Sequence, residues 1–267
     1  MQSLRSSRAR SLRRTRWMTQ HWLLLFLLLY GIFNLLPFAA PVLMKLGWTT
    51  LGNIVYDAYS FLCHQMAQRS FFLFGDKLMY NADQLPLALT GSAGQDTALL
   101  RHFRGNETFG WKVAWSDRMV SLYTGVWFAV LVYWILARRR VIAPASPWVA
   151  LALALPMVLD GGTHMISDQV GGLTGGFRYT NNWLATLTGH ALPASFYAGD
   201  ALGSFNSWMR LLSGALFAAG VVWFCFPYLD RYARHSVANL DYVLGQIKSG
   251  HLSGQEAGRE RVTWLGR

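Results

Sequence analysis

Charged residues are scarce in this sequence: Asp, Glu, Lys and Arg make up only 14% of its 267 residues. A typical soluble domain carries about 25% charged residues. Hydrophobic residues, in contrast, make up 53% of the chain. A chain with this balance is expected to have lipid as part of its solvent, so the composition disfavours a soluble protein and predicts an integral membrane protein.

Cysteine is also scarce, because Cys63 and Cys225 are the only two in the chain. This count rules out a disulfide framework and a zinc site built from four thiolates. The topology derived below places the two residues at different depths, so we expect both to be free thiols. The sequence also lacks a phosphate-binding glycine loop, a nucleophile elbow and the paired histidines of metalloproteases.

Acidic residues are outnumbered by basic ones, which gives the chain a formal net charge of +11. The basic residues form short runs beside apolar stretches and do not cover one face or one domain. That distribution is typical of membrane topology signals and not of a nucleic-acid interface. We therefore expect the lipid bilayer, and no nucleic acid, as a partner.

Long apolar runs are abundant. Four of them have roughly the twenty residues that a helix needs to cross the hydrocarbon of a bilayer. They are residues 22–44, 119–137, 147–166 and 209–226. The predicted fold is an all-α membrane protein, a bundle of about four transmembrane helices with interfacial or re-entrant helices on the outer side. The membrane domain then covers residues 22–226.

The positions of the arginines predict the orientation. Residues 1–21 contain six arginines and no acidic residue, and Arg138, Arg139 and Arg140 connect the second and third spans. Four spans place both termini on one side, and the positive-inside rule makes that side cytoplasmic. Residues 1–21 are then a basic cytoplasmic amino terminus, and residues 227–267 form an exposed, partly helical cytoplasmic tail.

Two long segments, residues 45–118 and 167–208, lie on the outer side in this topology and are too apolar for plain loops. If residues 51–75 crossed the membrane, the arginine-rich connection would move to the outer side. We therefore interpret this stretch as an interfacial or re-entrant helix packed on the bundle. The sequence alone leaves open whether residues 51–75 or 183–203 enter the membrane.

A short internal echo occurs late in the chain, where residues 181–189 resemble residues 206–214, 25 positions later. Both copies begin with an asparagine, Asn181 or Asn206, and carry a tryptophan two positions further on. An asparagine oxygen can cap the free backbone N–H groups of a helix start. The echo is therefore either a repeated helix start, the first copy opening a half-helix, or a coincidence.

Asp160 and His164 are ionisable residues inside the third span, where such residues are costly and are functional candidates by default. Their four-residue spacing puts them on one helical face, and Asp168 continues the same stripe if the helix persists. The pair could share a proton or bind a divalent metal. It could equally be a buried hydrogen-bonded pair with a purely structural role.

A second polar cluster, Cys63, His64, Gln65 and Arg69, lies on the outer segment. Cys and His are metal ligands and redox or nucleophilic groups, but neighbours on a helix point about 100° apart, so both cannot easily bind one ion. His64 remains a candidate third metal ligand beside the pair in the third span. The alternative is a small buried Cys63 and an interfacial His64.

Charged groups near the hydrocarbon must pair or reach water. We therefore expect the acidic and basic residues at the outer ends of the spans to converge on one outer-facing pocket, which either binds a small ligand or holds the fold together. The candidate ligand-binding residues are Cys63, His64, Gln65, Arg69, Asp117, Arg118, Asp160, His164 and Arg210.

Several short motifs, taken in order, carry a family resemblance. Their residues are Cys63, His64, Gln65, Arg69, Ser70, Phe71, Arg118, Tyr123, Gly125, Asp160, Gly161, Asn206, Arg210, Ser213, Gly214, Leu216 and Phe217. This pattern, spread over roughly residues 50–228, resembles the prokaryotic membrane-protein family known as domain of unknown function 2085. The resemblance implies a prokaryotic cytoplasmic membrane as the location.

The chain departs from the family pattern at two cysteines, where it has Ser116 and Met119, and at a glycine, where it has Ser121. A metal or redox site built from three thiols is therefore in doubt here. The family is itself uncharacterised, so the resemblance implies no activity. No catalytic residue and no cofactor is assigned; a divalent metal at Asp160, His164 and His64 is the one cofactor hypothesis, and it is not favoured.

Three function classes follow. A structural or small-ligand-binding protein would use the outer polar cluster, an accessory subunit would dock on other membrane-protein subunits, and a metal-dependent membrane enzyme would need a metal in the cluster. The chain shows no pair of long internal repeats, which argues against a large alternating-access transporter.

Overall fold

The computed structural model describes residues 2–249. Four helices in it are long and apolar enough to cross a membrane: α2 (Trp22–Lys45), α5 (Asp117–Ala137), α6 (Pro147–Gly175) and α10 (Phe205–Ser249). The chain is mostly helical. The predicted helical bundle with four candidate spans is thereby confirmed.

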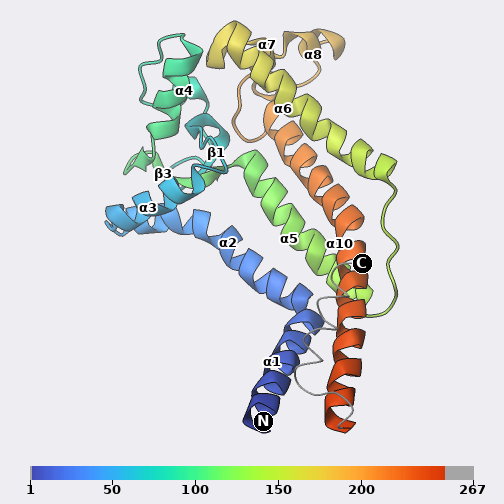
Figure 1. Ribbon diagram of the computed structural model, residues 1–267. Helices are drawn as coiled ribbons and strands as arrows, with labels where there is room; N and C mark the ends of the chain where they lie inside the picture. The colour runs from blue at the N-terminus through green and yellow to red at the C-terminus, as the bar shows by residue number, and fades with distance from the viewer. Residues whose placement is uncertain (1, 250–267) are drawn as a thin grey trace.

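Helix α10 is the centre of the bundle, because it packs along both α5 and α6, while α2 packs against α5 (Figure 1). Small residues allow the close approach that membrane helices use in place of a hydrophobic driving force. A Cβ atom at Gly125 would lie 3.0 Å from the Cβ of Ala218, and one at Gly220 would lie 3.0 Å from the Cβ of Leu153.

Two of these helices run well past the apolar stretches. Helix α6 continues to Gly175 because its polar outer turns are held by partners described below, and it kinks at Gly172, where φ is 72°. Helix α10 continues through Pro227, which removes one backbone hydrogen bond without ending the helix. Residues 250–267 of the predicted tail lie outside the described residues.

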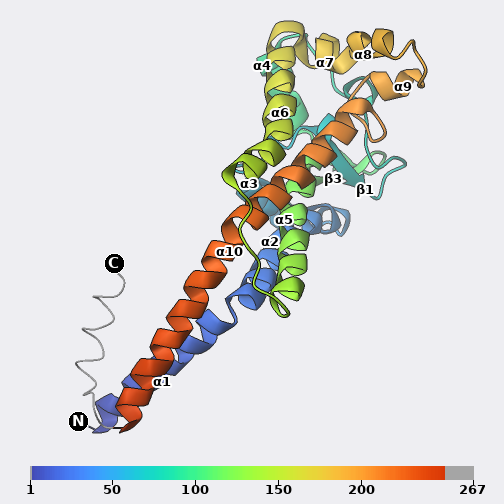
Figure 2. The same ribbon diagram turned by 90° about the vertical axis from the view of Figure 1, so that its right-hand side faces the viewer.

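The amino-terminal helix α1 (Gln2–Gln20) packs against the far part of α10. Arg16 donates to the Asp241 carboxylate, with a second bond of 3.1 Å. Figures 1 and 2 show this helix pair at one end of the molecule and α4 (Ala93–His102) at the other. The structure thus has a bundle with a two-helix arm at one end and a cap at the opposite end.

Residues 46–116 and 176–204, which we call the outer cap after the predicted orientation, contain strands as well as helices. Helix α3 is Thr49–Tyr59, followed by the 3₁₀ turns η1 (Ala67–Arg69) and η2 (Ala82–Gln84). A three-stranded antiparallel sheet has the order β1 (Ser70–Leu73), β3 (Gly110–Ser116) and β2 (Gly105–Asn106). The second part of the cap has three short helices, α7 (Phe177–Thr180), α8 (Asn182–Leu187) and α9 (Ala194–Tyr197).

The sheet corrects the interpretation of residues 51–75 as one interfacial or re-entrant helix. The first part is helical, but the last part forms β1, which pairs Ser70 with Ser116 on β3. The buried residues Val113 and Trp115 of β3 support this pairing, because they pack in one hydrophobic core with Tyr56 of α3. The all-α prediction therefore misses one small sheet.

Lys112 of β3 is fully buried, and its Nζ donates to the carbonyl oxygens of Gln65 (2.6 Å) and Arg101 (2.7 Å). Burial lowers the pKa of Lys112 to about 7; Cys63 opposes this effect, and the nearby Arg104 and Arg101 reinforce it. A lysine in this setting is held by neutral carbonyls and has no carboxylate partner among these contacts.

The pH dependence of stability is expected to reflect Lys112. Between pH 7 and about 10, the unfolded chain binds more protons than the folded one, so the stability should rise with pH, by at most about 1.4 kcal/mol per pH unit. Thermal unfolding in detergent at a series of pH values checks this. A Lys112→Met variant should lose that rise, and an unchanged slope would contradict the assignment.

Candidate functional site

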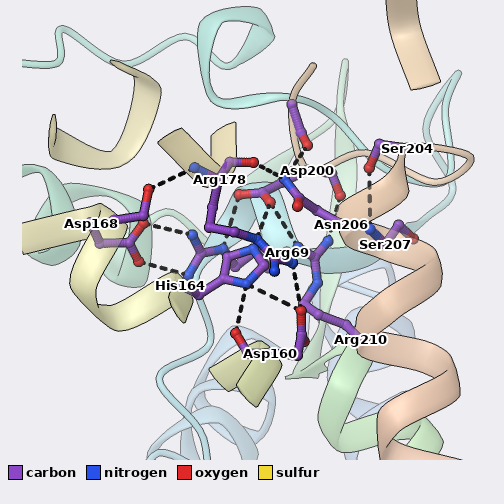
Figure 3. Close-up of polar contacts among 12 residues, drawn as sticks. Arg69, Asp160, His164, Asp168, Arg178, Asp200, Ser204, Asn206, Ser207 and Arg210 are labelled. Atoms are coloured by element: carbon purple, nitrogen blue, oxygen red, sulfur yellow. Dashed lines mark hydrogen bonds and ion pairs between the residues drawn. The ribbon is translucent and has the colours of Figure 1, made fainter. Parts of the chain in front are cut away.

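A buried polar network lies where the outer ends of α5, α6 and α10 meet the outer cap (Figure 3). It contains four aspartates and four arginines with one histidine between them. Its members are Arg69, Asp117, Arg118, Asp160, His164, Asp168, Arg178, Asp200 and Arg210. We call this set the outer ion-pair network.

Arg210 joins α10 to α5 and to the loop before α10. Its Nε donates to both carboxylate oxygens of Asp117, each at 2.8 Å. Its other two nitrogens donate to the carboxylate and the carbonyl of Asp200, at 2.7 and 2.6 Å. All three residues are buried, with exposures of 0 to 2%. This is a buried ion-pair cluster in which one arginine binds two carboxylates.

Arg69 of η1 extends this cluster to α6. It donates two hydrogen bonds of 3.0 Å to Asp168 and one of 2.9 Å to Asp200. Burial lowers the pKa of Arg69, but the two carboxylates outweigh it and the net pKa is raised. For Asp200, burial acts to raise the pKa, and Arg69 and Arg210 reverse this and hold it well below the ordinary value. Both groups are therefore charged.

Asp160 of α6 is the second centre of the network. Arg118 of α5 and Arg178 of α7 donate to its two carboxylate oxygens, each at 2.6 Å. The pKa of Arg178 is lowered, because burial outweighs the effect of Asp160. His164 lies one turn away, with its Nδ1 at 3.0 Å from the Asp160 carbonyl oxygen and its Nε2 at 3.8 Å from Asp200. The histidine thus sits between the two carboxylate centres.

The two asparagines of the internal echo meet beside the network. The Nδ2 of Asn181 donates to the Oδ1 of Asn206 at 3.3 Å, and the Nδ2 of Asn206 donates to the carbonyl oxygens of Arg178 and Gly199. Asn181 makes no side-chain cap bond to α8, which corrects that part of the expectation. Its amide instead binds carbonyls of the surrounding turns, including that of Tyr197 at 2.7 Å.

Three nitrogen atoms at this site are buried without a hydrogen-bond partner among the described residues: Arg118 Nε, Arg178 Nε and His164 Nε2. Because His164 Nδ1 lies 3.0 Å from a carbonyl oxygen, which can only accept, Nδ1 carries the proton of the neutral ring and Nε2 is then an acceptor. All three residues surround Asp160. The carboxylates are thus fully paired, while some of the donor capacity around Asp160 is not used by the protein.

Six residues predicted from the sequence meet in this network, namely Arg69, Asp117, Arg118, Asp160, His164 and Arg210, with Asp168 on the expected stripe. Sequence reasoning missed Arg178 and Asp200, which lie in short helices and loops. A signal for Asp200 was present: it is the only Asp, Glu, Lys or Arg between residues 179 and 209. A lone charge in so apolar a stretch needs a partner.

Cys63, His64 and Gln65 lie outside the network. The Sγ of Cys63 accepts from the backbone N–H groups of Gln65 and Ser116, both at 3.3 Å, and the Gln65 side chain donates to the Tyr56 carbonyl at 2.8 Å. His64 is exposed. The structure therefore does not bring the exposed His64 together with the buried Asp160 and His164.

The outer ion-pair network offers few side chains that could bind a metal ion. Within residues 2–249, no group of three or more His, Cys, Asp or Glu side chains is placed to hold a metal ion. The carboxylates of the network are bound by arginines, whose guanidinium groups remain charged and cannot act as ligands. The residues that form this site therefore favour ion pairing over metal binding.

Comparisons with known proteins agree with the membrane architecture. Residues 104–198 match the family described as "Predicted membrane protein (DUF2085)". The resemblance to this family is confirmed. The match covers α5 and α6 but not the motifs at residues 63–71 and 206–217, so it is narrower than the stretch over which the motifs resemble the family.

One curated relative is an uncharacterized protein of Methanocaldococcus jannaschii. It is 27% identical over 171 residues, which cover 62% of this chain and 81% of the relative. No solved structure matches the chain. The chain is therefore similar to predicted membrane proteins of unknown function.

Proposed function

We propose that the outer ion-pair network is a structural lock that fixes the outer cap on the four-span bundle, and that the protein serves as a rigid membrane-anchored scaffold. The observation that carries this proposal is the matched pairing in the network. Each of its four aspartates is bound by at least one of its four arginines.

The positions of the partners support a lock. Arg69 and Asp200 are 131 positions apart in the sequence, and Arg210 and Asp117 are 93 apart. Each pair therefore joins segments that the chain itself does not hold together. Buried charges are tolerated only when they are paired with good geometry, and breaking one pair is costly. Such pairs fix one arrangement of helices and cap.

A second candidate function is the binding of a small anion beside Asp160. The two unpartnered donors, Arg118 Nε and Arg178 Nε, favour it, because an anion could accept from both. A structural lock does not need this spare donor capacity. The two functions predict different responses of the melting temperature to added anions.

Asp160→Asn is expected to lower the free energy of unfolding by about 2 kcal/mol, because two buried arginines lose their charged partner. Asp57→Asn is the matched control: Asp57 pairs with Arg104 on the surface, with 70% of its side chain exposed, and should change stability little. Thermal unfolding of the purified protein in detergent measures both. Equal melting temperatures for Asp160→Asn and wild type would contradict the lock.

The anion hypothesis is tested by adding phosphate, sulfate or acetate to wild-type protein and to His164→Gln. Sulfate and phosphate stabilise folded proteins in general, so under the structural proposal each anion should shift the melting temperatures of the wild type and of His164→Gln equally. An anion that stabilises the wild type but not His164→Gln would favour the binding function instead.

The proposed location is a prokaryotic cytoplasmic membrane, with both termini in the cytoplasm and the outer cap outside. The arginine-rich connection between α5 and α6 supports this orientation. In a background without native cysteines, Arg139→Cys should react with an impermeant thiol reagent only after the cells are opened. Gln95→Cys on the exposed face of α4 should react in intact cells. The reverse pattern would invert the proposed orientation.

A further inference from the structure

A second feature lies at the opposite end of the bundle from the outer ion-pair network. It is a cavity of about 500 Å³ between the start of α2, the end of α5 and the middle of α10. Its lining includes His21, Trp22, Trp134, Arg138, Asp230 and Arg234. A cavity of this volume is within the range of small-molecule sites.

The cavity lies at the level where the apolar parts of the helices stop. Helix α2 begins at Trp22, and α5 ends at Ala137, immediately before Arg138. Tryptophans in this position favour the headgroup region of a bilayer. In a bilayer spanned by α2 and α5, the cavity would therefore lie at the level of the headgroups.

Its walls are amphipathic. Leu23 and Leu24 of α2 contribute apolar lining, and Arg138 and Arg234 contribute charged lining. An amphipathic occupant with a polar end and an apolar end fits these two walls. A soluble metabolite would leave the apolar wall unused, and a hydrocarbon would leave the charges unused.

The polar wall carries a net positive charge, because Asp230 is its one carboxylate and two arginines line it. Arg234 donates to Asp230 at 2.9 Å and to the Ala137 carbonyl at 3.3 Å. Arg138 is exposed and stacks 3.7 Å above the ring of Trp134. This cation–π contact orients the guanidinium without neutralising its charge. The lining thus presents an oriented cation to the headgroup layer.

An additional donor comes from Trp22. Its indole Nε1 is buried and has no hydrogen-bond partner among the described residues. Tryptophan N–H groups usually find an acceptor when buried. Because this nitrogen is closed off from solvent, it would reach an ester or phosphate oxygen in the cavity only after the Trp22 ring turns.

We propose that this cavity binds the headgroup of an anionic phospholipid, with Arg138 and Arg234 facing the phosphate and the α2 leucines facing the acyl chains. Basic cavities between transmembrane helices at the membrane surface bind anionic headgroups by this chemistry. The inference depends neither on the role of the outer ion-pair network nor on the orientation of the chain.

The test is lipid-dependent stability of the purified full-length protein in dodecyl maltoside micelles. Phosphatidylglycerol is expected to raise the melting temperature in a saturable manner, by several degrees more than phosphatidylcholine at the same concentration. Arg138→Gln should weaken the apparent affinity for phosphatidylglycerol by about fivefold. Inorganic phosphate at the same concentration should have no effect, because it cannot use the apolar wall.

The matched control is Arg140→Gln, which removes the same charge from the same exposed connection without lining the cavity. It should retain nearly the wild-type lipid response. Native mass spectrometry provides a second measurement that does not depend on unfolding: co-purified anionic lipid should be depleted in Arg138→Gln but not in Arg140→Gln. Equal losses in the two variants, or equal stabilisation by the two lipids, would overturn the proposal.

Discussion

Replacing Arg210 with methionine is expected to lower the free energy of unfolding by about 3–5 kcal/mol, the cost of leaving buried charges without their partner. Asp117 would keep only the backbone N–H of Arg118, at 2.8 Å, and Asp200 would lose two of its hydrogen bonds. Thermal or denaturant unfolding in detergent measures the loss. The matched control is Arg139→Met on the exposed connection, which should change stability little.

A double variant separates the cost of the broken ion pair from the cost of the lost side-chain packing. Arg210→Met combined with Asp117→Leu removes both charges, so it should be more stable than Arg210→Met alone. Two outcomes would contradict the lock. Arg210→Met could be as stable as the wild type, or the loss of stability in the double variant could equal the sum of the losses in Arg210→Met and Asp117→Leu, which would show that the two residues are not coupled.

Gly214→Leu is expected to have the second largest effect, a loss of about 3 kcal/mol, at the upper end of the usual cost of overpacking. A Cβ atom here would overlap the Ser121 hydroxyl and lie 3.1 Å from the Arg118 carbonyl oxygen. Helices α5 and α10 would have to move apart at Gly214, which lies one helical turn after Arg210. The melting temperature in detergent should fall accordingly.

The control for this prediction is Gly162→Leu on α6. A Cβ atom at Gly162 meets no atom within 4 Å, so a leucine there is expected to be neutral or slightly stabilising. If both glycine variants behave alike, helix propensity and not the α5–α10 contact decides the outcome.

The helices were largely predictable because lipid imposes a simple rule. A span needs about twenty apolar residues whatever its neighbours, so residues 22–44 could be recognised from the local sequence alone. The sheet follows no such rule. Its pairing of Ser70 with Ser116 depends on segments 46 positions apart (116 − 70), and residues 70–73 are as apolar as a helical segment.

The site was predictable in part for a related reason. Asp160, Arg118 and Arg210 are conspicuous because they are charges inside apolar helices. Arg178 and Asp200 sit in short irregular segments, where a charge is ordinary unless the fold buries it. Which arginine meets which carboxylate depends on how α7 and the loop before α10 fold back, and the periodicity of the sequence carries no information on that.

The unbroken course of α10 has a mechanical consequence. A helix of 45 residues is roughly 68 Å long at 1.5 Å per residue, more than twice the thickness of the hydrocarbon. Arg210 lies near one end and Asp241 near the other, so one helix connects the outer ion-pair network with the contact between α1 and α10. Pro227 lies between these two contacts, and the missing backbone hydrogen bond there makes it the position where a bend in the helix would cost least.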